Sequence, residues 1–158
     1  MTTKDETPFD EAAAHTHFSK ACFNSAWDLI EKVGRSAAEN EEMIRLNQAS
    51  LWHWTQRPDC TDRNLVVGYW QASRIRAIVG HADEAQRYAE LCERHSRALM
   101  PFYQASAQEA LARAAWARAD AAASKAHATQ ARVLAQAIVD ADERELILAD
   151  LETLGGDF

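Results

Sequence analysis

The chain has 158 residues, a length that fits one domain built around a single core. Its composition, 47% hydrophobic and 26% charged, is typical of a globular protein and excludes a wholly disordered chain. The formal net charge of −7 disfavours binding to nucleic-acid phosphates or to an anionic membrane surface, and no long basic stripe offsets it. We therefore expect neither a nucleic-acid partner nor a membrane partner.

Residues that form turns are scarce, with 5 Gly and 3 Pro in the whole chain. Alanine is abundant, and β-branched residues are too scattered to build a sheet. Both features favour long helices over many short strands. We predict an all-α fold, in which residues 1–10 form a polar N-terminal tail and residues 11–158 form a single helical domain.

The first two expected helices are separated by a glycine turn. Apolar residues recur at helical spacing up to Val33, and Gly34 then stands where a helix C-cap is expected. Ser36 and Glu39 have the spacing of a capping box, in which each side chain accepts a hydrogen bond from the other residue's backbone N–H. The second helix is expected to run from there to about Gln56.

The third expected helix, residues 63–79, is apolar on nearly all sides. We expect neighbouring helices to cover it on most of its surface. Asp62 is expected to cap this helix, and Gly80 is expected to end it. Asp83 is expected to open a fourth helix that runs to about Leu99.

The last three helices follow short connections. Pro101 is expected in the first turn of the fifth helix, Asp120 as the cap of the sixth, and Asp140 or Asp142 as the cap of the seventh. The glycines at 155–156 would close the last helix. Since helices joined by short loops pack as antiparallel neighbours, we predict three antiparallel helical hairpins and a C-terminal helix.

The segment from Tyr69 to Cys92 resembles one tetratricopeptide unit. Its turn, Gly80-His81-Ala82-Asp83-Glu84-Ala85, is similar to the Gly-Asp-aromatic-Asp-Glu-Ala pattern common in that family. Tyr103 lies one family period, 34 residues, after Tyr69. The resemblance implies a right-handed tetratricopeptide-like stack of hairpins, and a closed helical bundle is the alternative fold.

Three positions depart from the family's pattern. Arg76 stands where Tyr is usual, Ala89 where a large aromatic is usual, and Arg97 where Pro is usual. The first hairpin hardly resembles the family. The whole chain also resembles a set of uncharacterised bacterial proteins of this length with a similar W-H-W-x-Q-R-P-D-C stretch, and that resemblance implies no activity.

In tetratricopeptide arrays the first helix of each hairpin lines a concave groove, so the resemblance implies a surface that binds a partner. The groove positions carried over to this chain are Trp70, Arg74, Ala77, Gln104, Gln108 and Leu111. An Arg beside a Trp can hold a carboxylate while the ring supplies apolar contact. However, the Lys and Asn pair with which the family's chaperone-tail binders hold an acidic C-terminus is absent. The alternative for Arg74 and Arg76 is that they extend outward or pair with a Glu of the next helix.

The stretch S-L-W-H-W-T-Q carries two tryptophans on different faces of the second helix. Trp54 shares a face with Met43 and Leu51, so we expect it in the core. Trp52 points about 200° away, because each residue turns a helix by about 100°. It therefore either meets another helix or marks an exposed contact surface, and the two rings do not form one cage. His53 is expected to be a packing residue.

Residues that could bind a metal are scattered. Cys92 and His95 lie three residues apart on one helix face and are weak metal candidates, since zinc requires four converging ligands. A buried thiol beside an exposed histidine is the expected arrangement for this pair. His15 and His17 are expected to be solvated. The sequence has neither a Gly-x-Ser-x-Gly elbow nor a Gly-rich phosphate loop, so we assign no catalytic residue and expect no cofactor.

These features favour a non-catalytic adaptor that binds a protein or peptide in a helical-repeat groove. A structural or self-associating homodimer is the first alternative, and a helical-bundle enzyme or metal-binding protein is the second. The N-terminus has no signal-peptide pattern, no apolar run reaches the roughly 18 residues of a membrane span, and the three cysteines form no disulfide pattern. We therefore expect a cytoplasmic location.

Overall fold

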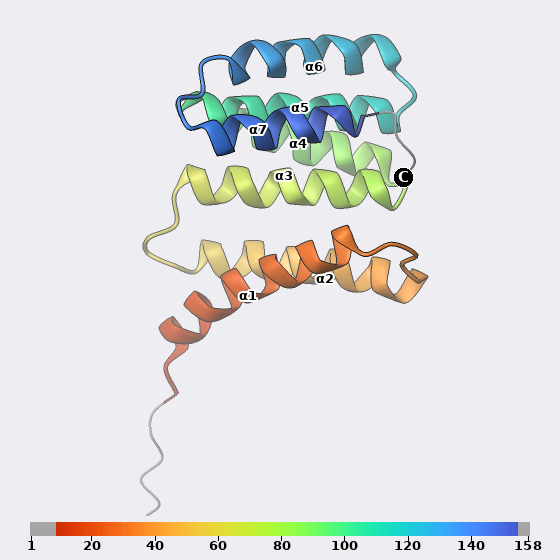
Figure 1. Ribbon diagram of the computed structural model, residues 1–158. Coiled ribbons are helices and arrows are strands. Elements are labelled where there is room, and N and C mark those ends of the chain that lie inside the picture. The colour runs from red at the N-terminus through yellow and green to blue at the C-terminus, as the bar shows by residue number, and fades with distance from the viewer. Residues whose placement is uncertain (1–8, 155–158) are drawn as a thin grey trace, which may run out of the picture.

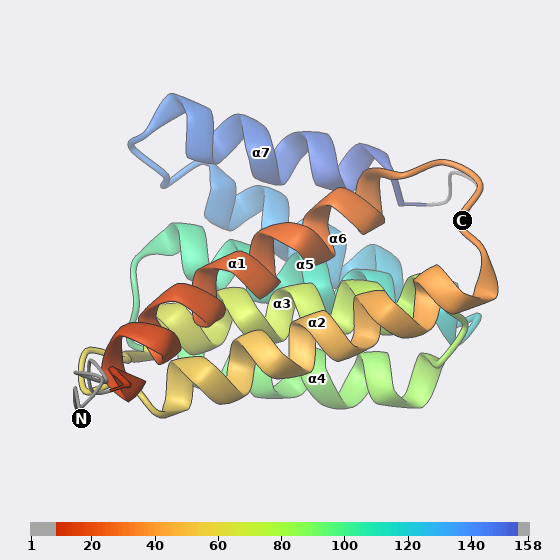
Figure 2. The same cartoon turned by 90° about the horizontal axis from the view of Figure 1, so that it is seen from below.

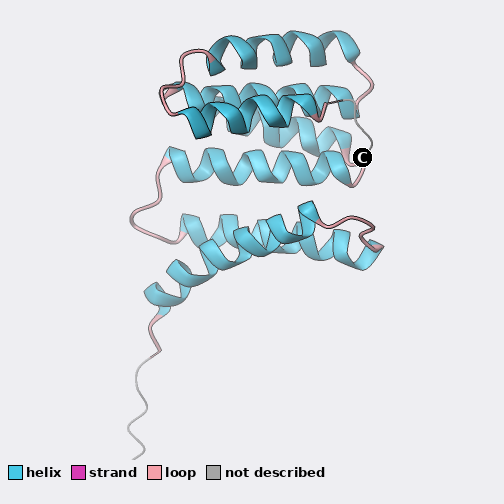
Figure 3. Cartoon of the chain, viewed as in Figure 1, coloured by secondary structure: helices cyan, strands magenta, loops and turns pink. Residues whose placement is uncertain are grey.

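The computed structural model describes residues 9–154, which form seven helices and no strand (Figure 1, Figure 3). The helices are α1 (Glu11–Glu31), α2 (Ala37–Thr55), α3 (Asp62–Ile78), α4 (Ala82–Ser96), α5 (Pro101–Ala117), α6 (Ala121–Ala135) and α7 (Ala141–Glu152). The fold is all-α, as predicted. None of the described helices is both long and apolar enough to cross a membrane. The glycines expected to close the last helix lie outside the described residues.

Most helix starts follow the predicted caps. The backbone N–H of Glu39 donates to the Ser36 hydroxyl, and the Ser36 N–H donates to the Glu39 carboxylate, so the capping box is confirmed. Asp120 caps α6, and Asp140 rather than Asp142 caps α7. Pro101 is the first residue of α5.

Two predicted caps are wrong. The N-cap of α3 is Thr61, whose backbone N–H donates to the side chain of Asn64, and Asp62 is already helical. The N-cap of α4 is His81 rather than Asp83. The backbone N–H of His81 also closes the end of α3 by donating to the carbonyl of Arg76, so a single residue serves both helices.

The helices pack as three hairpins, α1–α2, α3–α4 and α5–α6, followed by α7 (Figure 1). The hairpins lie in chain order, with α2 against α3, and α3 and α4 against α5. Helix α7 packs on α5 and α6. The predicted three hairpins and C-terminal helix are therefore present. Helices α1 and α7 lie on one face of the stack, and α4 lies on the opposite face (Figure 2).

The core is centred on α3 and α5. Helix α3 is buried along most of its length, as its apolar pattern predicted. Helix α5 has ten buried residues, six of them Ala, and these small side chains let α3, α4, α6 and α7 all contact it. Helices α3 and α5, the two most buried helices, therefore lie beneath the face that carries α1 and α7.

Candidate binding groove

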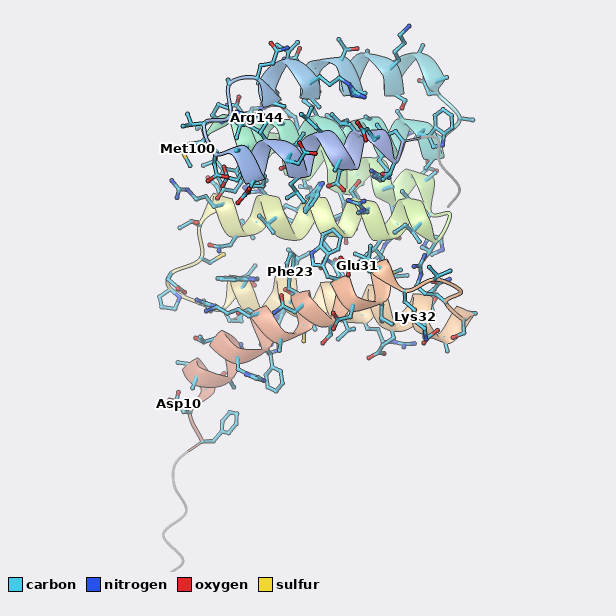
Figure 4. The ribbon with its side chains drawn as sticks, in the orientation of Figure 1. Asp10, Phe23, Glu31, Lys32, Met100 and Arg144 are labelled. Atoms are coloured by element: carbon cyan, nitrogen blue, oxygen red, sulfur yellow. The ribbon has the colours of Figure 1, made fainter. Side chains whose placement is uncertain are left out.

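Side chains from four helices line a cavity of about 550 Å³, which we call the central cavity. They are Phe23, Trp27, Ile30 and Glu31 of α1, Val67, Trp70 and Arg74 of α3, Phe102 and Ser106 of α5, and Leu146 and Asp150 of α7. In Figure 4, Phe23 and Glu31 lie along the side of α1 that faces α3. The cavity thus opens on the face where α1 and α7 lie.

Two neighbouring cavities extend the central cavity along α1. One, of about 320 Å³, shares Phe23 and Val67 with it. The other, of about 500 Å³, shares Ile30, Glu31 and Arg74. Because their linings overlap, the three cavities form one elongated depression, which we call the inner groove.

The apolar wall of the inner groove comes from one face of α1. Phe23, Trp27 and Ile30 are spaced four and three residues apart, so they project in nearly the same direction. All three are only partly buried. The Trp27 ring lies 5.3 Å from the Trp70 ring of α3, measured between centroids, so the two helices present a common aromatic surface.

The floor of the groove is held by a buried polar network. The indole nitrogen of Trp70 donates a hydrogen bond of 2.6 Å to Glu109, and the guanidinium of Arg113 donates one of 2.7 Å to the same carboxylate. Arg113 also donates to the backbone carbonyl of Asp150 and to the hydroxyl of Thr153. Because charges this deeply buried are tolerated only when they are paired and hydrogen-bonded, the network fixes α3, α5 and α7 against one another.

A second charged pair joins α3 to α7 at the wall of the cavity. Arg74 donates a 2.8 Å hydrogen bond to Oδ1 of Asp150, and both side chains are largely buried. The guanidinium carbon lies 5.5 Å from the ring centroid of Trp27 and 5.9 Å from that of Trp70. Burial raises the pKa of Asp150, and the nearby Glu109 adds to this, whereas Arg74 and Arg113 act in the opposite direction.

The structure brings together only two of the six predicted groove residues. Trp70 and Arg74 both line the central cavity. Ala77 and Leu111 are instead buried in the core cluster between the helices. The alternative of pairing with a Glu of the next helix describes Arg76, which pairs with Glu84 of α4 at 2.5 Å. Arg74 is also paired, but with Asp150 of α7.

Gln104 and Gln108 lie apart from the inner groove. Together with side chains of α4 and α6 they line a separate, smaller cavity. Gln104 donates to the carbonyl of Leu99, and the side-chain oxygen of Gln108 lies 2.8 Å from Nδ1 of His127. The positions of α5 that line the central cavity are Phe102 and Ser106, while Tyr103 and Arg113 line the two adjoining cavities.

Several residues that build the groove were not predicted from the sequence. Glu109 and Arg113 are four residues apart in an otherwise alanine-rich stretch, and this i,i+4 pair of opposite charges was a usable signal. Trp27 could have been found from its spacing with Phe23. Asp150 had no comparable signal, because its contact with Arg74 spans 76 residues of sequence.

The two tryptophans near the end of α2, Trp52 and Trp54, lie on different surfaces of the molecule. Trp52 is 56% exposed, and its ring meets the rings of His15 and His53 edge to face. Trp54 is only partly buried, unlike the core position predicted for it. The guanidinium carbon of Arg57 lies 3.9 Å from the centroid of the Trp54 ring. Trp54 also lines the 320 Å³ cavity, together with residues of α1 and α3.

His15 and His53 join α1 to α2. Their Nδ1 atoms lie 2.8 Å apart, so one ring must donate a proton to the other. The side chain of His15 is 12% exposed, so the prediction that it is solvated is wrong, whereas His17 is exposed as predicted. Burial lowers the pKa of His53, and the charge of a protonated His15 lowers it further.

Cys92 and His95 contact different partners. The Cys92 thiol is buried and donates to the carbonyl of Val66, and burial raises its pKa. His95 is only partly exposed, with Nδ1 2.8 Å from a carboxylate oxygen of Asp62. Across residues 9–154, no group of three or more His, Cys, Asp and Glu side chains is placed to hold a metal ion.

The inner groove is suited to binding. It combines a mostly apolar, aromatic lining with a few fixed polar groups, as ligand sites in proteins commonly do. Among the described residues that line the central cavity, Ser106 alone carries a hydroxyl group. This hydroxyl is buried and donates a hydrogen bond to the carbonyl of Phe102.

No protein-family model, curated protein or solved structure matches this chain.

Proposed function

We propose that the chain is a non-catalytic adaptor that binds an extended segment of another protein in the inner groove. The observation that carries this proposal is the partly exposed aromatic surface of α1 and α3, which borders three continuous cavities. A partner segment would bury this surface, and removal of apolar area from water is the main favourable contribution to association.

The fixed floor of the groove supports the proposal. Trp70 is held by Glu109, and Arg74 is held by Asp150, so both side chains are already ordered before a partner arrives. Ordering side chains on binding costs about 0.5–1.5 kcal/mol for each flexible one. A groove with pre-ordered side chains therefore binds more tightly than one whose walls must first become ordered.

The arrangement of the hairpins is consistent with a tetratricopeptide-like array, and that architecture is part of the proposal. In such an array α1, α3, α5 and α7 would be the helices that line the concave side. Side chains from these four helices line the central cavity. A cytoplasmic location is also part of the proposal, and the three cysteines being free thiols is compatible with it.

Selection from a displayed peptide library, followed by a pair of matched variants, tests the proposal. Phe23 lies in the inner groove, and Phe18 lies on the outer surface of the same helix, where it is 46% exposed. We expect Phe23→Ala to weaken binding of the selected peptides by about tenfold or more, since buried aromatic side chains dominate interfaces. Phe18→Ala should leave binding unchanged. Equal effects of the two variants would count against the groove.

Self-association is a second candidate function, favoured by exposed aromatics on the first hairpin. Phe18 and Trp52 both contact the ring of His53 and are both exposed, so they form one aromatic patch on α1 and α2. A second copy of the chain could cover this patch. Sedimentation equilibrium of the wild type and of Trp52→Ser tests this: a dimer that the substitution dissociates supports it, and a monomer at high concentration rejects it.

A further inference from the structure

Within residues 9–154, the cations in and beside the central cavity have hydrogen-bond or ion-pair partners, whereas some of the carboxylate oxygens do not. Among the described residues that line it, Arg74 is the only cation, and Asp150 already pairs with it. The cations of the adjoining 500 Å³ cavity are engaged as well. Lys32 pairs with Glu39, and Arg35 donates to several backbone carbonyls at the end of α1.

Carboxylate oxygens, by contrast, remain open. Oδ2 of Asp150 is buried and accepts no hydrogen bond from the described part of the chain. Glu31 lines both cavities, and residues 9–154 supply it with neither a hydrogen bond nor an ion pair. A buried acceptor without a donor is costly, so an occupant that brings a donor gains that energy on binding.

The surroundings of these carboxylates suit a long cationic side chain. The rings of Phe23, Trp27, Trp70 and Phe102 line the same cavity, and aromatic walls favour both methylene groups and a nearby positive charge. The cavity also continues in both directions along α1, which suits an extended chain better than a free amine.

We propose that the central cavity takes a lysine or arginine side chain of the bound segment, with its charged head against Oδ2 of Asp150 and near Glu31. This inference rests on the proposed function, because it names the residue type that the groove recognises. The aliphatic stem would lie along the aromatic wall, and Arg74 would keep its bond to Oδ1 of Asp150.

Small probes test this recognition directly in ¹⁵N-labelled full-length protein. The probes are Nα-acetyl-lysine amide, Nα-acetyl-arginine amide, the neutral Nα-acetyl-norleucine amide and the anionic Nα-acetyl-glutamate amide. We expect one or both basic probes to shift the indole N–H signals of Trp27 and Trp70, with little change at the exposed Trp52. Equal shifts with norleucine amide, or shifts with glutamate amide alone, would overturn the inference.

Matched substitutions assign the effect to the carboxylates. Asp150→Asn should weaken the response to the basic probe by about tenfold or more, because it removes a largely buried charge. Glu31→Gln, at an exposed position to which residues 9–154 offer neither a hydrogen bond nor an ion pair, should weaken it by about two- to fivefold. Glu41→Gln, an exposed acid on α2, is the control and should have no effect. Retention of the full response in both test variants would reject the assignment.

The two proposals can fail separately. In one outcome, a displayed library yields peptides that need Phe23 but carry no lysine or arginine and are insensitive to Glu31→Gln. That result would keep the groove as the binding site and reject recognition of a basic side chain. Basic probes that shift Trp27 and Trp70, together with selected peptides enriched in lysine or arginine, would support both.

Discussion

Trp70 and Glu109 are 39 residues apart in sequence, yet the indole nitrogen of Trp70 lies 2.6 Å from the carboxylate that accepts its hydrogen bond. The same carboxylate accepts a hydrogen bond from Arg113, whose guanidinium reaches the end of α7. The aromatic surface of the groove and the packing of three helices therefore depend on one buried acid. We therefore expect substitutions at Glu109 to lower the stability of the fold.

Glu109→Ala should lower the free energy of unfolding by about 3–5 kcal/mol, because it removes the carboxylate that neutralises the buried Arg113. Urea unfolding followed by circular dichroism measures the change. Glu41→Ala, at an exposed position of α2, is the control, with an expected change below about 0.5 kcal/mol. Similar losses for the two variants would contradict the importance assigned to the network.

Arg74 and Asp150 should show clear energetic coupling in a double-mutant cycle of Arg74→Ala and Asp150→Ala. We expect a coupling energy of about 1–3 kcal/mol, since both side chains are largely buried and directly hydrogen-bonded. The exposed pair Arg45 and Glu42 should give less than about 0.5 kcal/mol in the same measurement. A coupling of zero between Arg74 and Asp150 would mean that α7 is not held to α3 as described.

Helices α3 and α5 end in the same way but with different residues. Exchanging glycine and alanine at the two ends should therefore change the stability in opposite directions. Gly80 (φ 81°) and Ala119 (φ 61°) both adopt the left-handed conformation that follows a helix end. No atom would obstruct a Cβ at Gly80, so Gly80→Ala tests conformation alone. Thermal unfolding should show a loss of about 1 kcal/mol for Gly80→Ala and a gain of up to about 1 kcal/mol for Ala119→Gly. Changes of the same sign would contradict this geometry.

The His15–His53 contact predicts lower stability in acid. The pKa of His53 is below its ordinary value of 6.5 in the folded chain, so the unfolded chain binds more protons as the pH falls. The stability contribution of His53 should therefore be complete above pH 6.5 and decline as the pH falls below it. Urea unfolding between pH 8 and 5 should show a smaller loss for His53→Gln than for the wild type.

The exposed His17 supplies the control for that measurement. His17→Gln should keep the pH dependence of the wild type, because His17 takes no part in the contact between His15 and His53. If His17→Gln and His53→Gln flatten the curve equally, the effect does not come from the contact between α1 and α2.

Local signals predicted most of the fold. The capping pair Ser36 and Glu39, the caps Asp120 and Asp140, and Pro101 all act through neighbouring backbone groups, so their roles can be read from a few residues. These positions set the helix boundaries and hence the order of the hairpins.

The groove was less predictable, because its residues meet only after the hairpins stack. Trp54 has the spacing of a core residue, but it is only partly buried because its ring borders a cavity between α1 and α3. Gln104 was assigned to the groove by its place in the repeat, yet it lines a separate cavity, and α5 presents Phe102 and Ser106 to the central cavity instead. The position of α7, which brings Asp150 to Arg74, has no counterpart in the pattern of any single helix.

Binding of a partner segment in the inner groove can be followed directly through the five tryptophans of the chain. A peptide selected by display would be titrated into ¹⁵N-labelled full-length protein while the indole N–H signals are followed. We expect shifts at Trp27 and Trp70, which line the central cavity, and none at the exposed Trp52 and Trp116. Shifts confined to Trp52 or Trp116 would place binding on another surface and contradict the proposed role of the inner groove.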